Sequence, residues 1–149
     1  MYAHILVATD GSELAARALD HALGLAKALG SKLTIVTVTE PAALVGGGYA
    51  TIAGTAFDPI PELLEAQESA ARGLLDKAVQ TAAEAGIDAK SVYVNDSFPA
   101  EGIITTAVTS AADLIVMGSH GRRGLGRLLL GSQTSNVLAH TSIPVLVTR

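Results

Sequence analysis

Short apolar runs alternate with longer amphipathic segments along this chain. Runs rich in β-branched residues at 4–8, 33–38, 89–94, 114–117 and 145–147 predict strands. Between them, apolar residues return every three or four positions, which is the spacing of one face of a helix. Strands that alternate with helices favour right-handed crossovers and a parallel sheet. The pattern therefore predicts an α/β fold, a single doubly wound, Rossmann-like five-stranded parallel sheet with helices on both faces.

Capping residues set the limits of the predicted helices. Ser12 suits the N-cap of the first helix, and Gly30 suits its end. Pro61 starts the second helix, where a missing N–H costs least, and Gly86 follows its end. A third helix starts near residue 100 and a fourth spans 132–140. The predicted buried faces of the first three helices are Ala15, Ala18, Leu19, Ala22, Leu25, Ala26 and Leu29, then Leu64, Ala71, Leu75, Ala78 and Ala82, then Ile103, Ile104, Ala107 and Val108.

The periodic pattern fails from Thr39 to Ile60, a segment that contains two prolines and several glycines. It is long for a connection inside a compact domain. Segments of this kind are lids, binding loops or disordered stretches. The sequence does not choose among these three.

Composition narrows the class of protein. The 149 residues suit one domain over 1–149, and a core with 49% hydrophobic but only 3% aromatic residues must be aliphatic. Cysteine is absent, which excludes disulfides and thiolate chemistry. No run reaches the ~20 apolar residues that span a bilayer. A net charge of −4 argues against a general nucleic-acid or acidic-membrane binder. We therefore expect a soluble, cytoplasmic protein.

The stretch from Asp113 to Ser135 carries the main candidate chemistry. Gly118, Gly121 and Gly131 follow a predicted buried strand, and Ser132 opens the predicted helix 132–140. Glycines here would allow positive φ and bring main-chain N–H groups close to a ligand, where a Cβ would obstruct. The helix start adds N–H groups from Ser132, Gln133 and Thr134 and the positive end of the helix dipole. This arrangement predicts a phosphate-binding segment.

Other candidates fall at the predicted carboxyl ends of strands, where doubly wound sheets bind ligands. Asp10 could contact the ligand, either by accepting a hydrogen bond from a ribose hydroxyl or by approaching a phosphate-bound Mg²⁺. Alternatively, it is a turn residue whose side chain bonds its own backbone. His120 is either a phosphate contact or a polar filler. Arg122, with Arg123 and Arg127, either faces a phosphate or lies on a solvated loop. His4, His21 and His140 lack metal-ligand spacing, so no protein metal site is expected.

The chain resembles the ATP-binding branch of the universal stress protein family. The spacing of Gly118, Gly121, Gly131 and Ser132 is similar to the family's G-x-x-G, nine residues, G-[ST]. The opening segment HILVATDGSELAARAL (His4 to Leu19) and the closing segment SIPVLV (Ser142 to Val147) also resemble family motifs. The resemblance covers the whole chain and implies the adenine nucleotide alpha hydrolase-like form of the predicted fold.

The resemblance also implies roles for individual residues. Ala8, Thr9 and Asp10 would line one wall of an ATP site. Val38 would meet the adenine through its backbone, and Met117 would close the base slot.

The resemblance and the motifs together predict a function. The expected function is that of an ATP-binding regulatory protein of the stress response, with ADP or AMP as other possible nucleotides and Mg²⁺ held mainly through the phosphates. A homodimer through the last strand, Pro144 to Thr148, would cover an apolar sheet edge. The alternatives are a slow ATP hydrolase or phosphotransfer enzyme, and an interaction module without nucleotide. Because G-x-x-x-x-G-K-[ST] and a triad elbow are absent, no catalytic residues are assigned.

Overall fold

The computed structural model describes residues 1–41, 61–120 and 130–149. Their elements, in chain order, are β1 (His4–Ala8), α1 (Glu13–Leu29), β2 (Lys32–Val38), α3 (Pro61–Glu84), β3 (Ala89–Val94), α4 (Pro99–Thr109), β4 (Leu114–Gly118), α5 (Ser132–His140) and β5 (Val145–Thr148). The predicted strands and helices are confirmed, with boundaries that shift by about one residue. The segments 42–60 and 121–129, which include most of the predicted Thr39 to Ile60 loop, lie outside the described residues.

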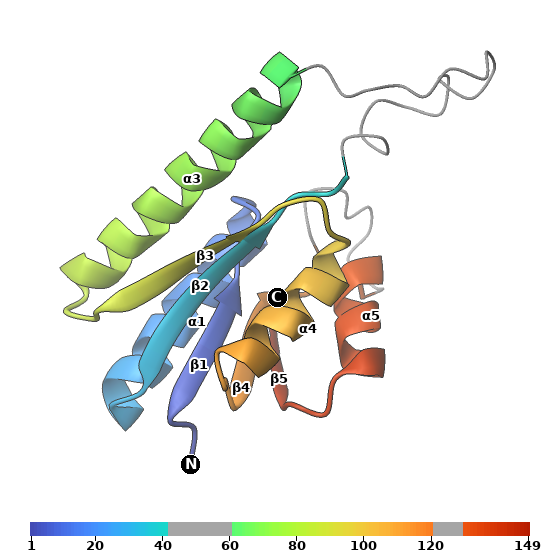
Figure 1. The fold of residues 1–149 in the computed structure, drawn as a ribbon. Helices are drawn as coiled ribbons and strands as arrows, with labels where there is room; N and C mark the ends of the chain where they lie inside the picture. The colour runs from blue at the N-terminus through green and yellow to red at the C-terminus, as the bar shows by residue number, and fades with distance from the viewer. Residues whose placement is uncertain (42–60, 121–129) are drawn as a thin grey trace.

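The five strands form one parallel sheet in the order β3-β2-β1-β4-β5 (Figure 1). Ile5 of the central strand β1 stands opposite Leu33 of β2 on one side and Leu114 of β4 on the other. The order of the strands along the chain reverses between β1 and β4. In a doubly wound sheet this reversal opens a crevice at the carboxyl ends of the strands, which is the usual place for a ligand. The α/β fold expected from the pattern is confirmed.

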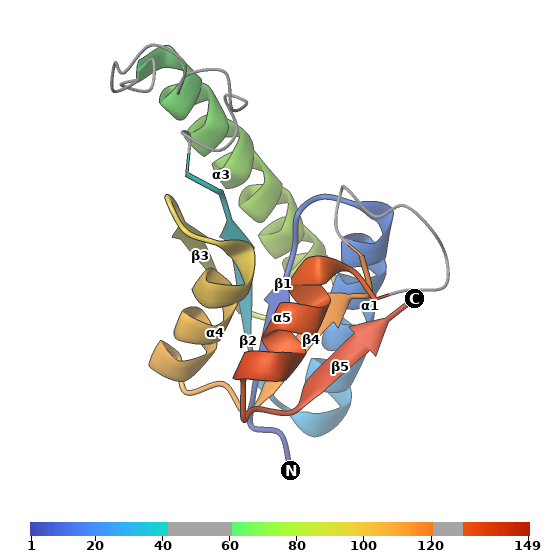
Figure 2. The ribbon, with the colours of Figure 1, turned by 90° about the vertical axis from the view of Figure 1, so that its right-hand side faces the viewer.

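The sheet separates two apolar layers (Figure 2). Ile5, Val7, Leu114 and Val116 face α1 and α3. Leu6, Ile115 and Met117 point to the other face, where Ile103 of α4 and Val137 of α5 cover them. Adjacent residues of β1 and β4 thus enter opposite layers, because successive side chains of a strand alternate between faces. Both faces are covered, which accounts for the aliphatic runs in the sequence.

Helix α1 begins and ends where the capping residues predict. The Ser12 hydroxyl accepts the N–H of Ala15 at 3.2 Å, and Gly30 adopts the left-handed φ of 68° while its N–H donates to the Ala26 carbonyl. Ala15, Ala18, Leu19, Ala22 and Ala26 of the predicted face are buried. Leu25 is half-buried and Leu29 is 38% exposed, so the packed face narrows toward the end of the helix.

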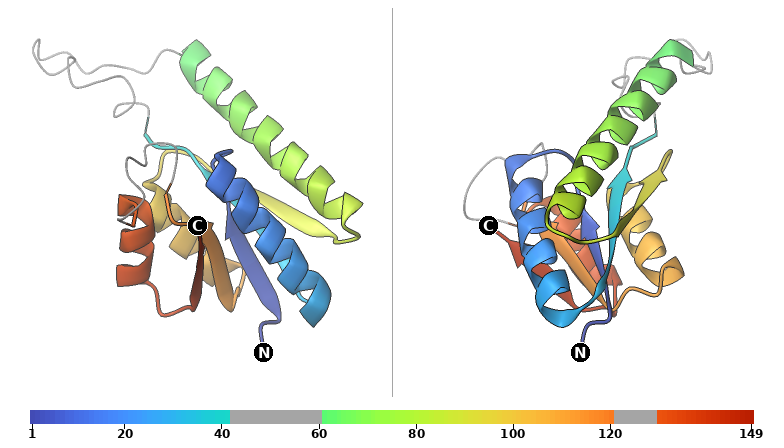
Figure 3. Two further views of the ribbon diagram at one scale, coloured as in Figure 1. Left: turned by 180° about the vertical axis from the view of Figure 1, so that it is seen from behind. Right: turned by 90° about the vertical axis from the view of Figure 1, so that its left-hand side faces the viewer.

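Helix α3 is longer than its packed part. Ala71, Leu75, Ala78 and Ala82 are buried as predicted, but Leu64 is 41% exposed. The first turns of α3 extend past the strands, so the sheet does not cover them (Figure 3). In α4, Val108 is also exposed, at 65%. These two predictions of buried positions are wrong because periodicity cannot show where a neighbouring layer ends.

Among the helices that the structure describes, none is both long and apolar enough to cross a lipid bilayer.

Candidate functional site

The carboxyl edge of the sheet brings together the ends of β1, β2 and β4. Ala8 stands opposite Val36 in the register, so Val38 lies two positions further along its strand. The N–H of Thr9 donates to the Val36 carbonyl at 2.9 Å and keeps the chain close to β2 after β1 ends. Gly118 ends β4 opposite Thr148 of β5. This is the edge on which the sequence places Asp10, Val38 and Gly118.

Ser119 joins the end of β4 to the start of α5. It is 3% exposed, and its N–H donates to the Thr148 carbonyl at 2.8 Å. Its own carbonyl accepts the N–H of Gly131 at 2.8 Å and the hydroxyl of Thr134 at 3.2 Å. Its hydroxyl lies 3.1 Å from Nδ1 of His120. No sequence pattern indicates this role of Ser119, since serine after a strand is common in turns.

Thr134 fixes the first turn of α5 from the inside. Its side chain is 2% exposed, and its hydroxyl donates to the Gly118 carbonyl at 2.9 Å as well as to that of Ser119. Sequence reasoning assigned Thr134 only a main-chain N–H. The side chain makes the attachment that aims the helix start.

Gly131 is favoured by the close approach of neighbouring atoms rather than by unusual backbone angles. Its φ is −60° and its ψ is 153°, which any residue can adopt, whereas a Cβ would lie 3.1 Å from the Ser119 carbonyl oxygen and 3.2 Å from His120 Cα. Gly118 likewise lacks positive φ, and a Cβ there would lie 3.1 to 3.2 Å from atoms of Leu14. The expectation of positive φ at these two glycines is therefore wrong. A Cβ at either position would crowd neighbouring protein atoms, while its effect on a ligand stays a prediction.

The first turn of α5 presents main-chain donors. Gly131 is its N-cap and has no side chain to cap it, and the first helical bond runs from the Ser135 N–H to the Gly131 carbonyl at 2.9 Å. The N–H groups of Ser132, Gln133 and Thr134 precede that bond, so the helix itself offers them no acceptor. Together with the helix dipole, such groups suit an anion.

Asp10 takes part in the turn that starts α1. One of its carboxylate oxygens, Oδ1, accepts the Ser12 N–H at 2.9 Å, and Gly11 between them has φ of +78°. The Thr9 hydroxyl accepts the Gly11 N–H at 3.4 Å. The turn role foreseen as one alternative is thus present. A role toward ribose or Mg²⁺ stays a prediction.

Three residues expected to line the nucleotide site share one side of the sheet. Ala8, Val38 and Met117 belong to the apolar cluster under α4 and α5. Met117 is only 5% exposed, while Ala8 and Val38 are half-buried at the rim. Gly102 of α4 approaches Val38 so closely that a Cβ would lie 2.8 Å from its Cγ1. The fold therefore sets an apolar wall beside the polar start of α5.

Gln133 contributes a contact that its position in the sequence did not reveal. Its side-chain oxygen Oε1 accepts the N–H of Ala100 in the first turn of α4 at 3.2 Å. The N-cap of α4 is Phe98, which provides no side-chain hydrogen bond. The weak capping residue was a possible signal, because such a helix start needs acceptors from elsewhere.

Part of the predicted phosphate segment lies outside the described residues. Gly121, Arg122, Arg123 and Arg127 all belong to 121–129, so their predicted roles stay predictions. His120, the last residue before this gap, is half-buried and bonds Ser119.

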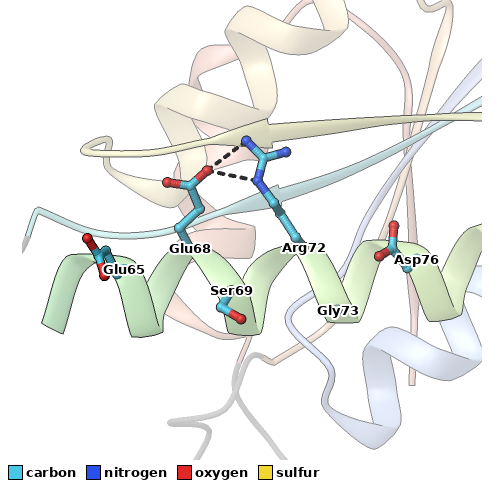
Figure 4. Close-up of a pocket in the computed structure, with 6 residues that line it drawn as sticks. All are labelled: Glu65, Glu68, Ser69, Arg72, Gly73 and Asp76. Atoms are coloured by element: carbon cyan, nitrogen blue, oxygen red, sulfur yellow. Dashed lines mark hydrogen bonds and ion pairs between the residues drawn. The ribbon is translucent and has the colours of Figure 1, made fainter. Parts of the chain in front are cut away.

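A solvent-open hollow of about 500 Å³ lies elsewhere, along α3 (Figure 4). Its walls come from that helix alone, and Arg72 is engaged by Glu68 at 2.7 Å. The other acidic residues that line the hollow, Glu65 and Asp76, would repel a phosphate. Within the described ranges, no group of three or more histidine, cysteine, aspartate or glutamate side chains is arranged to hold a metal ion. The lining residues of the hollow are Glu65, Glu68, Ser69, Arg72, Gly73 and Asp76.

The strand order and the two helical layers define a Rossmann-like α/β protein. The model of the universal stress protein family matches residues 1–149, and the chain belongs to that family.

Three of the similar proteins match this chain over nearly their whole length. Universal stress protein YxiE of Bacillus subtilis is 34% identical over 149 residues, which is 100% of both chains. The solved structure of MJ0577, from Methanocaldococcus jannaschii, superposes with a TM-score of 0.81 at 29% identity and covers 99% of this chain and 96% of its own. A universal stress protein solved in complex with cAMP is 28% identical, with a TM-score of 0.67 and coverage of 99% and 97%.

Proposed function

We propose that this protein binds an adenine nucleotide, with ATP as the expected ligand, at the carboxyl edge of the sheet. It would act as a nucleotide-dependent regulator of the stress response. The observation that carries the proposal is the start of α5, where main-chain donors without a side-chain cap stand beside a glycine at which a Cβ would be crowded by Ser119 and His120. A family member in complex with cAMP supports the choice of an adenine nucleotide.

The residues at this edge fit the three parts of a nucleotide. The apolar wall of Ala8, Val38 and Met117 suits a base, since Val38 and Ala8 are still partly open at the rim. Thr9 and Asp10 would take the ribose side. The phosphates would lie against the N–H groups of α5, helped by His120. The full proposed set is Ala8, Thr9, Asp10, Val38, Met117, Gly118, His120, Gly121, Arg122, Gly131, Ser132, Gln133 and Thr134.

Magnesium would accompany ATP through the phosphate oxygens. Mg²⁺ keeps several waters and is commonly bound by one or two carboxylates together with substrate phosphates. Asp10 is the carboxylate nearest in sequence to the end of β1 and would be the protein's contribution.

Calorimetric titration of ATP into the purified protein tests the site. We expect a dissociation constant of about micromolar order, because the favourable free energy of several charge-assisted hydrogen bonds is offset by the entropy lost on association. Gly131→Val should abolish binding, since its side chain would press on the Ser119 carbonyl and His120 and disturb the helix start. Gly24→Ala, in α1 where a Cβ meets no atom within 4 Å, is the matched control and should bind normally. Equal binding by wild type and Gly131→Val would place the site elsewhere.

The bound nucleotide would act mainly as a signal. No residue is assigned to cleave phosphate, so we expect turnover well below the ~1–100 s⁻¹ of kinases. A slow hydrolase remains the alternative. Steady release of phosphate from ATP in proportion to protein concentration, at a rate below that of kinases, would favour it.

A homodimer through β5 completes the proposal. Within the described sheet β5 lies at one end of the strand order, next to β4. Val145, Leu146 and Val147 are half-buried there, so pairing with a second copy would cover apolar surface and satisfy main-chain groups.

A further inference from the structure

We propose that Gln133 is a positioning residue that ties the phosphate side of the site to its base side. Its backbone belongs to the first turn of α5, and its side chain caps the first turn of α4. Through α4 it would set the position of Val38. The inference rests on the nucleotide site proposed above and concerns how the two halves of that site are held together.

The first step is the need of α4 for an acceptor. Its first position is Pro99, which has no N–H, and its N-cap Phe98 is 57% exposed and gives no side-chain hydrogen bond. The first helical bond runs from the Gly102 N–H to the Phe98 carbonyl at 2.9 Å. The N–H of Ala100 precedes it and therefore has no acceptor within the helix. Gln133 supplies one, at 3.2 Å from a different helix.

The second step leads from Ala100 to the base side. Gly102, two positions along α4, is buried, and a Cβ built there would lie 2.8 and 2.9 Å from the two Cγ atoms of Val38 and 3.3 Å from Cγ1 of Val94. The helix backbone thus lies directly on the Val38 side chain. Closely packed interiors transmit small displacements, so the position of the first turn of α4 determines where Val38 stands.

The third step concerns how the start of α5, which carries Gln133, is held in place. Thr134, adjacent to Gln133, is fixed to the Gly118 and Ser119 carbonyls, so the start of α5 is anchored to β4. Gln133 therefore projects from a fixed base, and its side chain can hold α4 in place. Because the N–H of Gln133 remains when the side chain is shortened, the two roles of this residue can be separated by mutation.

Gln133→Ala tests the positioning role. The amide of Ala100 should exchange its hydrogen faster, and the methyl resonances of Val38 should shift, in the protein without ligand. Adenosine, which has a base but no phosphate, should bind about fivefold more weakly, as expected for the loss of one net hydrogen bond. Inorganic tripolyphosphate should bind as to wild type, because the main-chain donors of α5 are retained.

Gln133→Glu provides the converse variant. A carboxylate keeps an acceptor for the Ala100 N–H and is favourable at the start of α4. Protection of the Ala100 amide and the affinity for adenosine should return to wild-type levels. Tripolyphosphate should bind more weakly, since a negative charge now stands in the first turn of α5. A variant that only destabilised the fold would not change the affinities for adenosine and tripolyphosphate independently of each other.

Asn136→Ala is the matched control. It removes an amide side chain from an exposed position of the same helix and should change none of these measurements. Unchanged Ala100 exchange and Val38 resonances in Gln133→Ala would overturn the link, whether or not any nucleotide binds. If wild-type protein binds neither ATP nor adenosine while those two signals do change, the proposed function fails and the structural link stands.

Discussion

The hydroxyl of Thr134 donates to the main-chain carbonyl of Gly118 at 2.9 Å, which joins the first turn of α5 to the last residue of β4. The two residues are 16 positions apart in the chain. Because the Thr134 side chain is buried and bonded to the end of β4, it fixes the direction in which the donors of α5 point. The position of the proposed phosphate site therefore depends on a side chain that does not itself face the phosphate.

Replacing Thr134 with valine should weaken both the fold and the site. Valine has a similar shape but no hydroxyl, so the carbonyls of Gly118 and Ser119 lose a donor and the free energy of unfolding should fall by about 1–3 kcal/mol. ATP affinity should fall as well, because the helix start is less firmly aimed. Urea unfolding and calorimetry measure the two effects. Thr134→Ser keeps the hydroxyl and should retain most of both; equal losses in the two variants would contradict the role of the hydrogen bond.

Gly102→Ala should destabilise the contact between α4 and the sheet. The added methyl group would lie 2.8 and 2.9 Å from the Cγ atoms of Val38, so Val38 or the helix must shift, at about 1–3 kcal/mol. Gly73→Ala in α3, where a Cβ meets no atom within 4 Å, should instead stabilise the protein by about 0.5–1 kcal/mol. Thermal or urea denaturation of both variants and of the wild type measures these changes in the free energy of unfolding. Opposite signs for the two substitutions are the expected result, and stabilisation by Gly102→Ala would show that the packing at Gly102 is loose.

Asp113 should make stability depend on pH in the acid range. Its carboxylate accepts the N–H of Ala3 at 2.8 Å and that of His4 at 3.0 Å, and the bond from Ala3 is the largest cause that lowers its pKa below 3.8. Because the folded pKa lies below the unfolded one, the ionised group stabilises the fold above the unfolded pKa. This contribution disappears as pH falls through the folded pKa.

Denaturation of Asp113→Asn at several pH values checks this expectation. The variant should be less stable than wild type at pH 7, and the difference should narrow below about pH 4. Asp20→Asn removes the same charge from an exposed position of α1 and serves as the control. A difference between wild type and Asp113→Asn that stays constant down to pH 2 would show that the carboxylate's charge is unimportant.

Val147→Pro should separate the proposed dimer. The carbonyls of Pro144 and Thr148 accept N–H groups of Ile115 and Ser119, so they point toward β4. Alternation along the strand then directs the N–H of Val147 to the outer edge, where proline removes it. Light scattering after size exclusion should give a dimer for wild type and a monomer for the variant. Val147→Thr keeps the N–H and should remain dimeric, while a monomeric wild type at working concentration would overturn the proposal.

Patterns of neighbouring residues were sufficient to predict the helices and strands and their order along the chain. Ser12, Gly30 and Pro61 mark helix ends by their own backbone chemistry, and a run such as 114–117 reads as a strand without knowledge of its neighbours. Alternating strands and helices then favour a parallel sheet. Because all parallel strands end at one edge, the sequence also placed Asp10, Val38 and Gly118 on a common side of the fold.

Contacts between distant segments were decided only by the tertiary structure. The exposure of Leu64 depends on where the sheet ends under α3, and the need for glycine at 131 depends on how closely Ser119 and His120 approach. The bond from Ala100 to Gln133 joins two helices 33 positions apart. The sequence by itself determined periodicity, caps and the edge that carries the candidate site, because these depend on neighbours along the chain. Close approach and shared hydrogen bonds depend on neighbours in space, so they became visible only once the layers were packed.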